Sequence, residues 1–185
     1  MKKVILITAL ILFNAILVWG VPFEKDDFSA RPEGVIPGAA RDVFIQNIPS
    51  VARQFIGIPY EYGGNPVTTG TSDNSYLFFS IYARAAQIAG LKYYGYLPMK
   101  NLLQHTRKVD ENRLQNGDLM VLNNHHAAMI YNIEAETDRL FLIYASEKRR
   151  QVISFNSDNI VFGAYWLENL KGFYRLTDTM LRPER

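Results

Sequence analysis

The spacing of apolar residues changes from a helical pattern to a strand pattern near Gly117. Before that point, hydrophobic residues recur every three or four positions, which predicts helices over residues 42–57 and 73–89. A shorter helix is predicted over residues 99–104, directly after Pro98. After Gly117, short runs rich in Val, Ile, Tyr and Phe predict strands over residues 118–122, 127–133, 140–145, 151–155 and 172–176. Helices followed by strands indicate an α+β domain with an antiparallel sheet.

Proline, glycine and capping residues mark the boundaries of these segments. Pro49 is expected to divide the first helical segment into two short helices. Residues 59–71 contain five prolines and glycines and are therefore predicted to form a loop. Asp73 or Asn74 is a suitable N-cap for the helix that follows, because a short polar side chain can accept a hydrogen bond from a free backbone N–H group.

The first twenty residues have the pattern of an export signal. Lys2 and Lys3 precede an apolar run from Val4 to Val18, and the segment ends with small or β-branched residues before Val21. This run is shorter than the roughly 20 residues of a membrane-spanning helix, which favours cleavage after Gly20 over an uncleaved anchor. The protein is therefore expected to be exported to the periplasm or cell envelope, with attachment to the inner membrane as the alternative.

The remaining chain divides into three parts. Residues 21–41 are polar and contain several prolines and glycines, so they are expected to form an extended N-terminal arm. Residues 42–178 carry the helical and strand patterns and are expected to form one domain, followed by a C-terminal tail over residues 179–185.

Composition excludes several kinds of chemistry. The 185 residues include no cysteine, which rules out disulfides, thiolate metal sites and a cysteine nucleophile. Three histidines argue against a multi-histidine metal centre, and no metal or other cofactor is expected. The 20 basic and 18 acidic residues leave a net charge of +2, and Lys2 and Lys3 account for that excess. No nucleic-acid partner is therefore indicated by charge.

Two places carry candidate chemistry. The start of the helix at Asp73 offers Ser72, Asn74 and Ser75 beside unpaired backbone N–H groups, an environment that can stabilise an oxyanion. Simple helix capping explains the same residue types. His125 and His126 precede an apolar strand, and at most one of them can face the helix, because adjacent strand residues point to opposite faces. A surface histidine in a turn is the alternative.

In their order along the chain, several motifs resemble the NlpC-type family of bacterial cell-wall cysteine peptidases. Gly57–Gly64 resembles the family's G-x-PY-x-YGG loop, and Ser72–Leu77 falls where the family has FDCSGL. Leu97-Pro98 with Gln104 resembles LPR…Q, and Leu114–Leu119 resembles LQPGDL. His126–Tyr131 resembles HVGIYIG, and Tyr144-Ala145 resembles HA. The resemblance covers about residues 50–176 and implies a reduced papain-like fold, with helices packed on an antiparallel sheet.

The differences from the family fall on its catalytic residues. Asn74 stands where the family has its nucleophilic cysteine, and Tyr144 stands where it often has a third polar residue. His126 corresponds to the family's base, so Asn74 and His126 are expected to lie close together. Tyr76 replaces a glycine and is expected to narrow the groove. Asparagine cannot form an acyl-thioester, so Asn74, His126 and Tyr144 are interpreted as a vestigial site with no active catalytic residue.

The resemblance therefore implies a binding protein derived from a peptidase. The expected function is to bind a peptidoglycan stem peptide or an envelope protein without cleaving it, in a groove lined by Tyr60, Tyr62, Asp73, Asn74, Ser75, Tyr76 and His126. One alternative is a hydrolase or acyl-transfer enzyme that uses Ser72 or Ser75 as nucleophile and His126 as base. Another is a structural envelope subunit. Membrane contact is expected only through an uncleaved signal segment.

Overall fold

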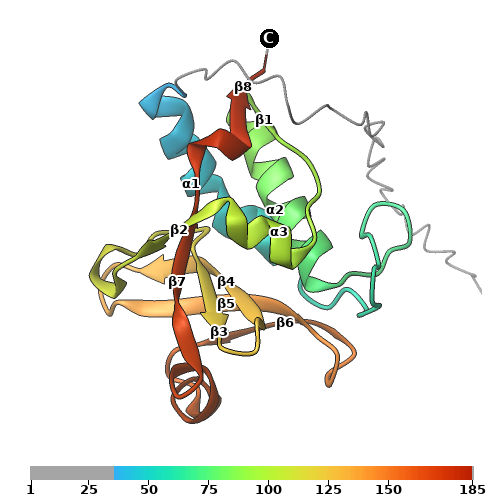
Figure 1. The fold of residues 1–185 in the computed structure, drawn as a ribbon, viewed down its shortest axis with the longest axis vertical. Helices are drawn as coiled ribbons and strands as arrows, with labels where there is room; N and C mark the ends of the chain where they lie inside the picture. The colour runs from blue at the N-terminus through green and yellow to red at the C-terminus, as the bar shows by residue number, and fades with distance from the viewer. Residues whose placement is uncertain (1–35, 185) are drawn as a thin grey trace, which may run out of the picture.

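A six-stranded antiparallel sheet forms the centre of the computed structural model, which describes residues 36–184 (Figure 1). The strand order is β2-β7-β3-β4-β5-β6. The strands are β2 Thr106–Val109, β3 Leu119–Leu122, β4 Ala127–Glu134, β5 Arg139–Ser146, β6 Gln151–Asn156 and β7 Leu170–Leu176. All five strands predicted from the apolar runs are present, and the expected α+β fold class is confirmed.

Three helices lie together on one side of this sheet (Figure 1). They are α1 Gly38–Arg53, α2 Asn74–Ile88 and α3 Met99–Gln104. A separate pair of strands, β1 Leu91–Tyr93 and β8 Leu181–Pro183, is antiparallel. The short helical segments are η1 Glu111–Arg113, the π-helical η2 Phe162–Leu167, and η3 Asp178–Met180. None of the helices within residues 36–184 is long and apolar enough to cross a membrane.

The sheet separates two hydrophobic clusters, because alternate strand residues face opposite sides. The first cluster lies between the sheet and the helices, and from β4 and β5 it includes Ala127, Met129, Tyr131, Ile143 and Ala145. The second cluster lies on the other face and contains the alternate residues Ala128, Ile130 and Leu142, covered by Phe162 and Trp166 of η2. This division decides which side chains can meet the start of α2.

Helix α1 is continuous through Pro49, so the expected division into two short helices is wrong. Proline removes one helical hydrogen bond and crowds the preceding turn. However, Phe44, Ile48, Val51 and Ala52 form a buried stripe that extends across the proline. Packing of this stripe against the rest of the first cluster holds the segments before and after Pro49 in one helix.

Both ends of the expected domain differ from the sequence-based division. Helix α1 begins at Gly38, so residues 38–41, which were assigned to the arm, belong to the domain. The predicted tail is also structured, because Leu181, Arg182 and Pro183 pair with the three residues of β1. Arg41 and Asp178 join these two ends through an ion pair of 2.7 Å. The predicted signal peptide and residues 21–35 of the arm lie outside the described residues.

Candidate functional site

The start of α2 is fixed by the carboxylate of Asp73, which is the N-cap of the helix. One carboxylate oxygen accepts a hydrogen bond from the backbone N–H of Tyr76 at 2.9 Å, as expected for a capping residue. The other accepts from the backbone N–H of Gly63 at 3.1 Å. The same side chain therefore caps the helix and holds the loop of residues 59–71 against it.

Two glycines allow this loop to fold tightly on itself. Gly63 has a φ of +73°, a conformation that other residues rarely adopt. A Cβ atom on Gly64 would lie 2.4 Å from the Thr71 side-chain oxygen and 3.0 Å from the Glu61 carbonyl oxygen. The Gly-Gly pair noted in the sequence is thus required by backbone geometry next to the candidate site.

Asn74 bonds to the sheet and not to a neighbouring catalytic group. Its side-chain oxygen accepts a hydrogen bond of 2.7 Å from the backbone N–H of Ala145 in β5. Ala145 is buried, with 2% of its surface exposed. The Asn74 side chain therefore links the first residue of α2 to the sheet.

Neither nearby serine has the surroundings of a nucleophile. Ser72 is fully buried, and its hydroxyl donates to the backbone carbonyl of Asp73 at 2.9 Å. The hydroxyl of Ser75 accepts from the backbone N–H of Met99 at 3.1 Å and also bonds to the side chain of Tyr96. Activation of a serine requires a base within hydrogen-bonding distance, and no histidine is among these partners.

His126 and Tyr144 lie together on the sheet face opposite the helices. Their rings meet edge to face with centroids 5.3 Å apart, and the His126 ring lies 5.5 Å from that of Trp166 in the second cluster. Burial lowers the pKa of His126, which favours the neutral imidazole. The structure therefore brings His126 to Tyr144, and the expected approach of His126 to Asn74 stays a prediction.

The period of two along a strand decides which residues of β4 and β5 face the helices. Tyr131 and Met129 face the helices, so counting back by two residues places Ala127, and not His126, on that face. Ala145 occupies the corresponding position on β5, beside Tyr144. The alternation of apolar residues along the strands is visible in the sequence, and it could have identified Ala127 and Ala145 as residues that face the helices.

Tyrosines surround the start of α2. Tyr76 and Tyr96 stack with ring centroids 4.0 Å apart. Tyr62 is 90% exposed, in the loop held by Asp73. Burial and the carboxylates of Glu147 and Asp73 raise the pKa of Tyr60, and burial together with Asp73 raises the pKa of Tyr96. Both phenols are therefore protonated at neutral pH and can donate hydrogen bonds.

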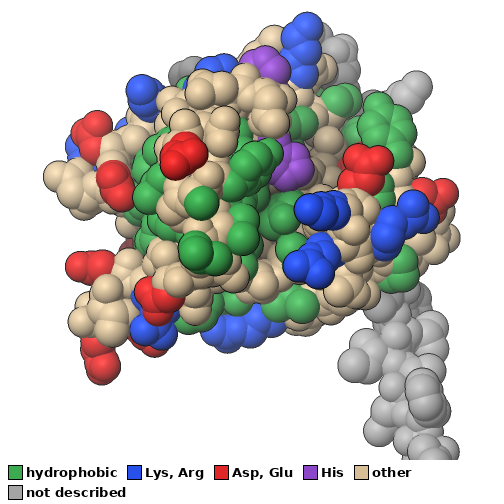
Figure 2. Space-filling view, turned by 90° about the horizontal axis from the view of Figure 1, so that it is seen from below, with side chains coloured by type: hydrophobic (Ala, Val, Ile, Leu, Met, Phe, Trp, Pro, Cys, Tyr) green, Lys and Arg blue, Asp and Glu red, His purple; other side chains and the backbone are tan. Residues whose placement is uncertain are grey.

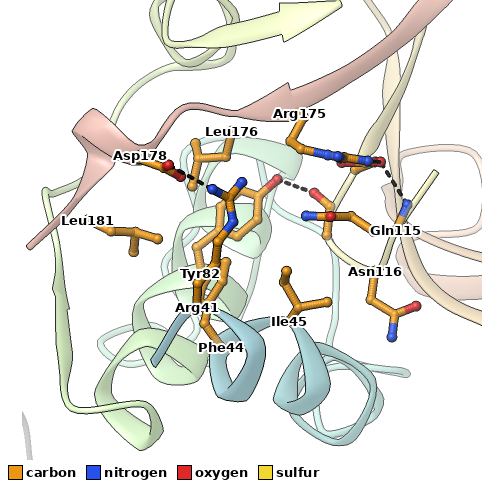
Figure 3. A pocket seen from close by; sticks show the side chains of 12 residues that line it. Arg41, Phe44, Ile45, Tyr82, Gln115, Asn116, Arg175, Leu176, Asp178 and Leu181 are labelled. Atoms are coloured by element: carbon orange, nitrogen blue, oxygen red, sulfur yellow. Dashed lines mark hydrogen bonds and ion pairs between the residues drawn. The ribbon is translucent and has the colours of Figure 1, made fainter. Parts of the chain in front are cut away.

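A pocket elsewhere in the structure is built from paired charges (Figure 3). Arg175 makes hydrogen bonds of 2.8 and 2.7 Å to the two carboxylate oxygens of the buried Asp118. The hydroxyl of Tyr82 donates to the carbonyl of Gly117 at 2.6 Å, and Arg41 binds Asp178 at the rim. These contacts join α1 to η3, and they join α2 and β7 to the Gly117-Asp118 segment, so we interpret the pocket as structural. Within residues 36–184, no group of three acidic residues or histidines has the arrangement of a metal site.

Comparisons with known proteins support the fold. No family model matches the chain, and no curated protein matches it by sequence. Among solved structures, it is similar to a lipoprotein-like protein of the NLP/P60 family from Staphylococcus aureus subsp. aureus Mu50, with a TM-score of 0.52 and 22% identity. The similarity covers 73% of this chain and 42% of that protein, so the chain spans less than half of its length. The expected NlpC-like fold is thereby confirmed.

Proposed function

We propose that this protein is an exported NlpC-like domain that binds a peptidoglycan stem peptide without cleaving it. The observation that carries this proposal is that the side-chain oxygen of Asn74, which the motif resemblance aligns with the family's nucleophile, bonds to the Ala145 N–H. The motif resemblance and the NLP/P60 structural neighbour support a cell-wall peptide as the ligand.

Loss of cleavage follows from three features of the site. The chain contains no cysteine, so no thiolate can attack a peptide bond. The histidine of the resemblance contacts Tyr144 and Trp166 on the other face of the sheet. The hydroxyls of Ser72 and Ser75 bond to the backbone. These contacts argue against the serine-nucleophile alternative.

Retained binding is supported by the tyrosine surface at the start of α2. We define this surface as Tyr60, Tyr62, Tyr76 and Tyr96, with the carboxylate of Asp73 at its centre. Protonated phenols donate hydrogen bonds to peptide carbonyls, and their rings offer flat apolar area. The Asp73 carboxylate also suits a ligand amine, because opposite charges attract at short range.

Titration calorimetry with a purified disaccharide-tetrapeptide fragment of peptidoglycan tests the proposal. Tyr62→Ala is expected to weaken binding by about 30-fold, because tyrosines that anchor a ligand often contribute about 2 kcal/mol. Tyr165→Ala is the matched control, since Tyr165 is an exposed tyrosine in η2, across the sheet from α2. Equal binding by both variants would refute the tyrosine surface as the binding site. No binding by the native chain would favour an envelope protein as the partner.

Export is the second part of the proposal and rests on residues 1–20. Mass spectrometry of the protein recovered from the producing cell's envelope is expected to show a chain that begins at Val21. Recovery of an intact Met1 would instead indicate a domain that the apolar run anchors to the membrane.

A further inference from the structure

A turn with adjacent basic residues lies beside the tyrosine surface. Lys148, Arg149 and Arg150 are exposed in the turn between β5 and β6. This turn and the loop that leads into α2 lie on the right of Figure 1, and Figure 2 shows basic side chains gathered on that side of the molecule. The Arg150 N–H donates to the Glu147 carbonyl at 3.1 Å, and the Arg149 N–H donates to the Ser146 hydroxyl at 3.2 Å. The three basic residues, the basic turn, are therefore held on an ordered backbone.

Tyr60 connects the basic turn to the start of α2 through its backbone. Its N–H donates to the Arg150 carbonyl at 2.9 Å. On the opposite edge of the same segment, the Ser72 N–H donates to the Pro59 carbonyl at 2.9 Å, and Tyr60 and Ser72 form a parallel bridge. Neighbouring extended segments lie about 4.8 Å apart, so about 10 Å separates the backbone of Arg150 from that of Ser72. The basic turn and the capping carboxylate of Asp73 therefore lie on opposite sides of Tyr60.

Opposite charges are separated across Tyr60. The turn carries three basic side chains and one acidic one, Glu147, which leaves a net charge of +2, whereas Glu61 and Asp73 leave −2 on the other side. Burial and the carboxylates of Glu147 and Asp73 raise the pKa of Tyr60, and the charge of Arg150 opposes this shift, so groups of both signs act on the same phenol. Within the part of the chain that the structure describes, no ion pair involves the basic turn. Its cations are therefore available to a ligand.

We infer, on the basis of the proposed peptide binding, that the ligand of the tyrosine surface carries a free carboxylate and that the basic turn binds it. An arginine guanidinium can donate two parallel hydrogen bonds to one carboxylate. A short peptide can reach both charged sides, because about three extended residues span about 10 Å between an amine at Asp73 and a carboxylate at the basic turn. The separation of charge across Tyr60 therefore favours a zwitterionic peptide over a neutral one.

Titration calorimetry with two synthetic stem tetrapeptides tests this assignment. One tetrapeptide has free carboxylates, and the other has carboxamides in their place. A carboxamide keeps a hydrogen-bond acceptor but loses the negative charge. The native chain is therefore expected to bind the amidated tetrapeptide about fivefold more weakly, which corresponds to about 1 kcal/mol for an exposed ion pair.

Variants of the turn identify the group that binds the carboxylate. Lys148→Gln with Arg149→Gln is expected to remove most of the preference for the free carboxylate and to leave the affinity for the amidated tetrapeptide unchanged. The matched control is Arg107→Gln with Lys108→Gln, an exposed pair of the same residue types in β2, at the opposite edge of the sheet from β6. The control is expected to keep the full preference. Far-ultraviolet circular dichroism confirms that each variant is folded.

Three results would overturn the assignment, and each has a different meaning. Equal affinity of the native chain for the two tetrapeptides would refute carboxylate binding and leave the proposed peptide binding intact. Equal loss of the preference in both double variants would show that the net charge of the molecule, and not the position of the basic turn, attracts the ligand. Binding of neither tetrapeptide by the native chain would refute the proposed peptide binding itself, and carboxylate recognition with it.

Discussion

Replacement of Asn74 by alanine is expected to destabilise the fold, because a buried N–H group of β5 would lose its acceptor. The β4–β5 ladder ends at the pair Met129 and Ile143, near the start of β4 and the end of β5. Ala145 lies two residues beyond that pair and donates to the Asn74 side chain at 2.7 Å. Asn74 thus supplies an acceptor where β4 no longer does.

The position of β6 supports the same geometry. Ala145 pairs with Val152 of β6. The Val152 N–H donates to the Ile58 carbonyl and the Val152 carbonyl accepts from the Gly57 N–H, so neither group bonds to Ala145. In an antiparallel ladder this identifies a pair without mutual hydrogen bonds, so the Ala145 N–H points away from β6. In Asn74→Ala it would be left unsatisfied and buried, at a cost of about 1–3 kcal/mol in the free energy of unfolding.

Urea unfolding followed by tryptophan fluorescence measures this effect, because Trp166 is 1% exposed in the folded protein. With a slope of about 1–3 kcal/mol per molar urea, a loss of 2 kcal/mol lowers the midpoint by roughly 1 M. Asn74→Asp is the matched control, since it keeps the acceptor and places a carboxylate at a helix N-terminus. An unchanged midpoint in Asn74→Ala, or equal losses in both variants, would refute the reasoning.

Three further predictions concern the site and its surroundings. Asn74→Cys alone is expected to remain inactive on peptidoglycan fragments in a chromatographic assay, because Ala127 and not His126 faces the helices. Asn74→Cys with Ala127→His is expected to show more activity. Turnover by the single variant would contradict this reasoning. Burial lowers the pKa of His126 in the folded state, so the unfolded state binds more protons below about pH 6.5 and stability falls as the pH drops through that value. Urea midpoints at pH 7.5 and pH 5.5 should therefore differ less in His126→Gln than in the native chain, and an equal difference would exclude His126 as the cause. Asp118→Asn breaks the buried ion pair with Arg175 and is expected to lower the free energy of unfolding by about 3–5 kcal/mol, measured by thermal unfolding. Asp178→Asn breaks the exposed pair with Arg41 and should lower it by less than about 1 kcal/mol. Similar losses in both variants would show that burial does not decide the cost.

Local patterns in the sequence were sufficient for most of the secondary structure. The helix over Met99–Gln104 and the N-cap at Asp73 agree with the structure, because both depend on neighbouring residues alone. Strand β2 was missed because Thr106–Val109 lies at the edge of the sheet and alternates weakly. Strand β8 was missed because its stability depends on pairing with β1, about 90 residues earlier in the chain.

The sequence by itself determined that this chain has no cysteine nucleophile, that it combines helices with an antiparallel sheet, and that Asp73 caps α2. Only the tertiary structure decided which residues share a side of the sheet. A shift of one residue along β4 moves every side chain to the other face of the sheet. A motif resemblance can be wrong by one residue, so it cannot show which face of the sheet His126 is on. Packing against η2 brings His126 to Trp166, because the two hydrophobic clusters fix the register of the strand, and Asn74 bonds to β5.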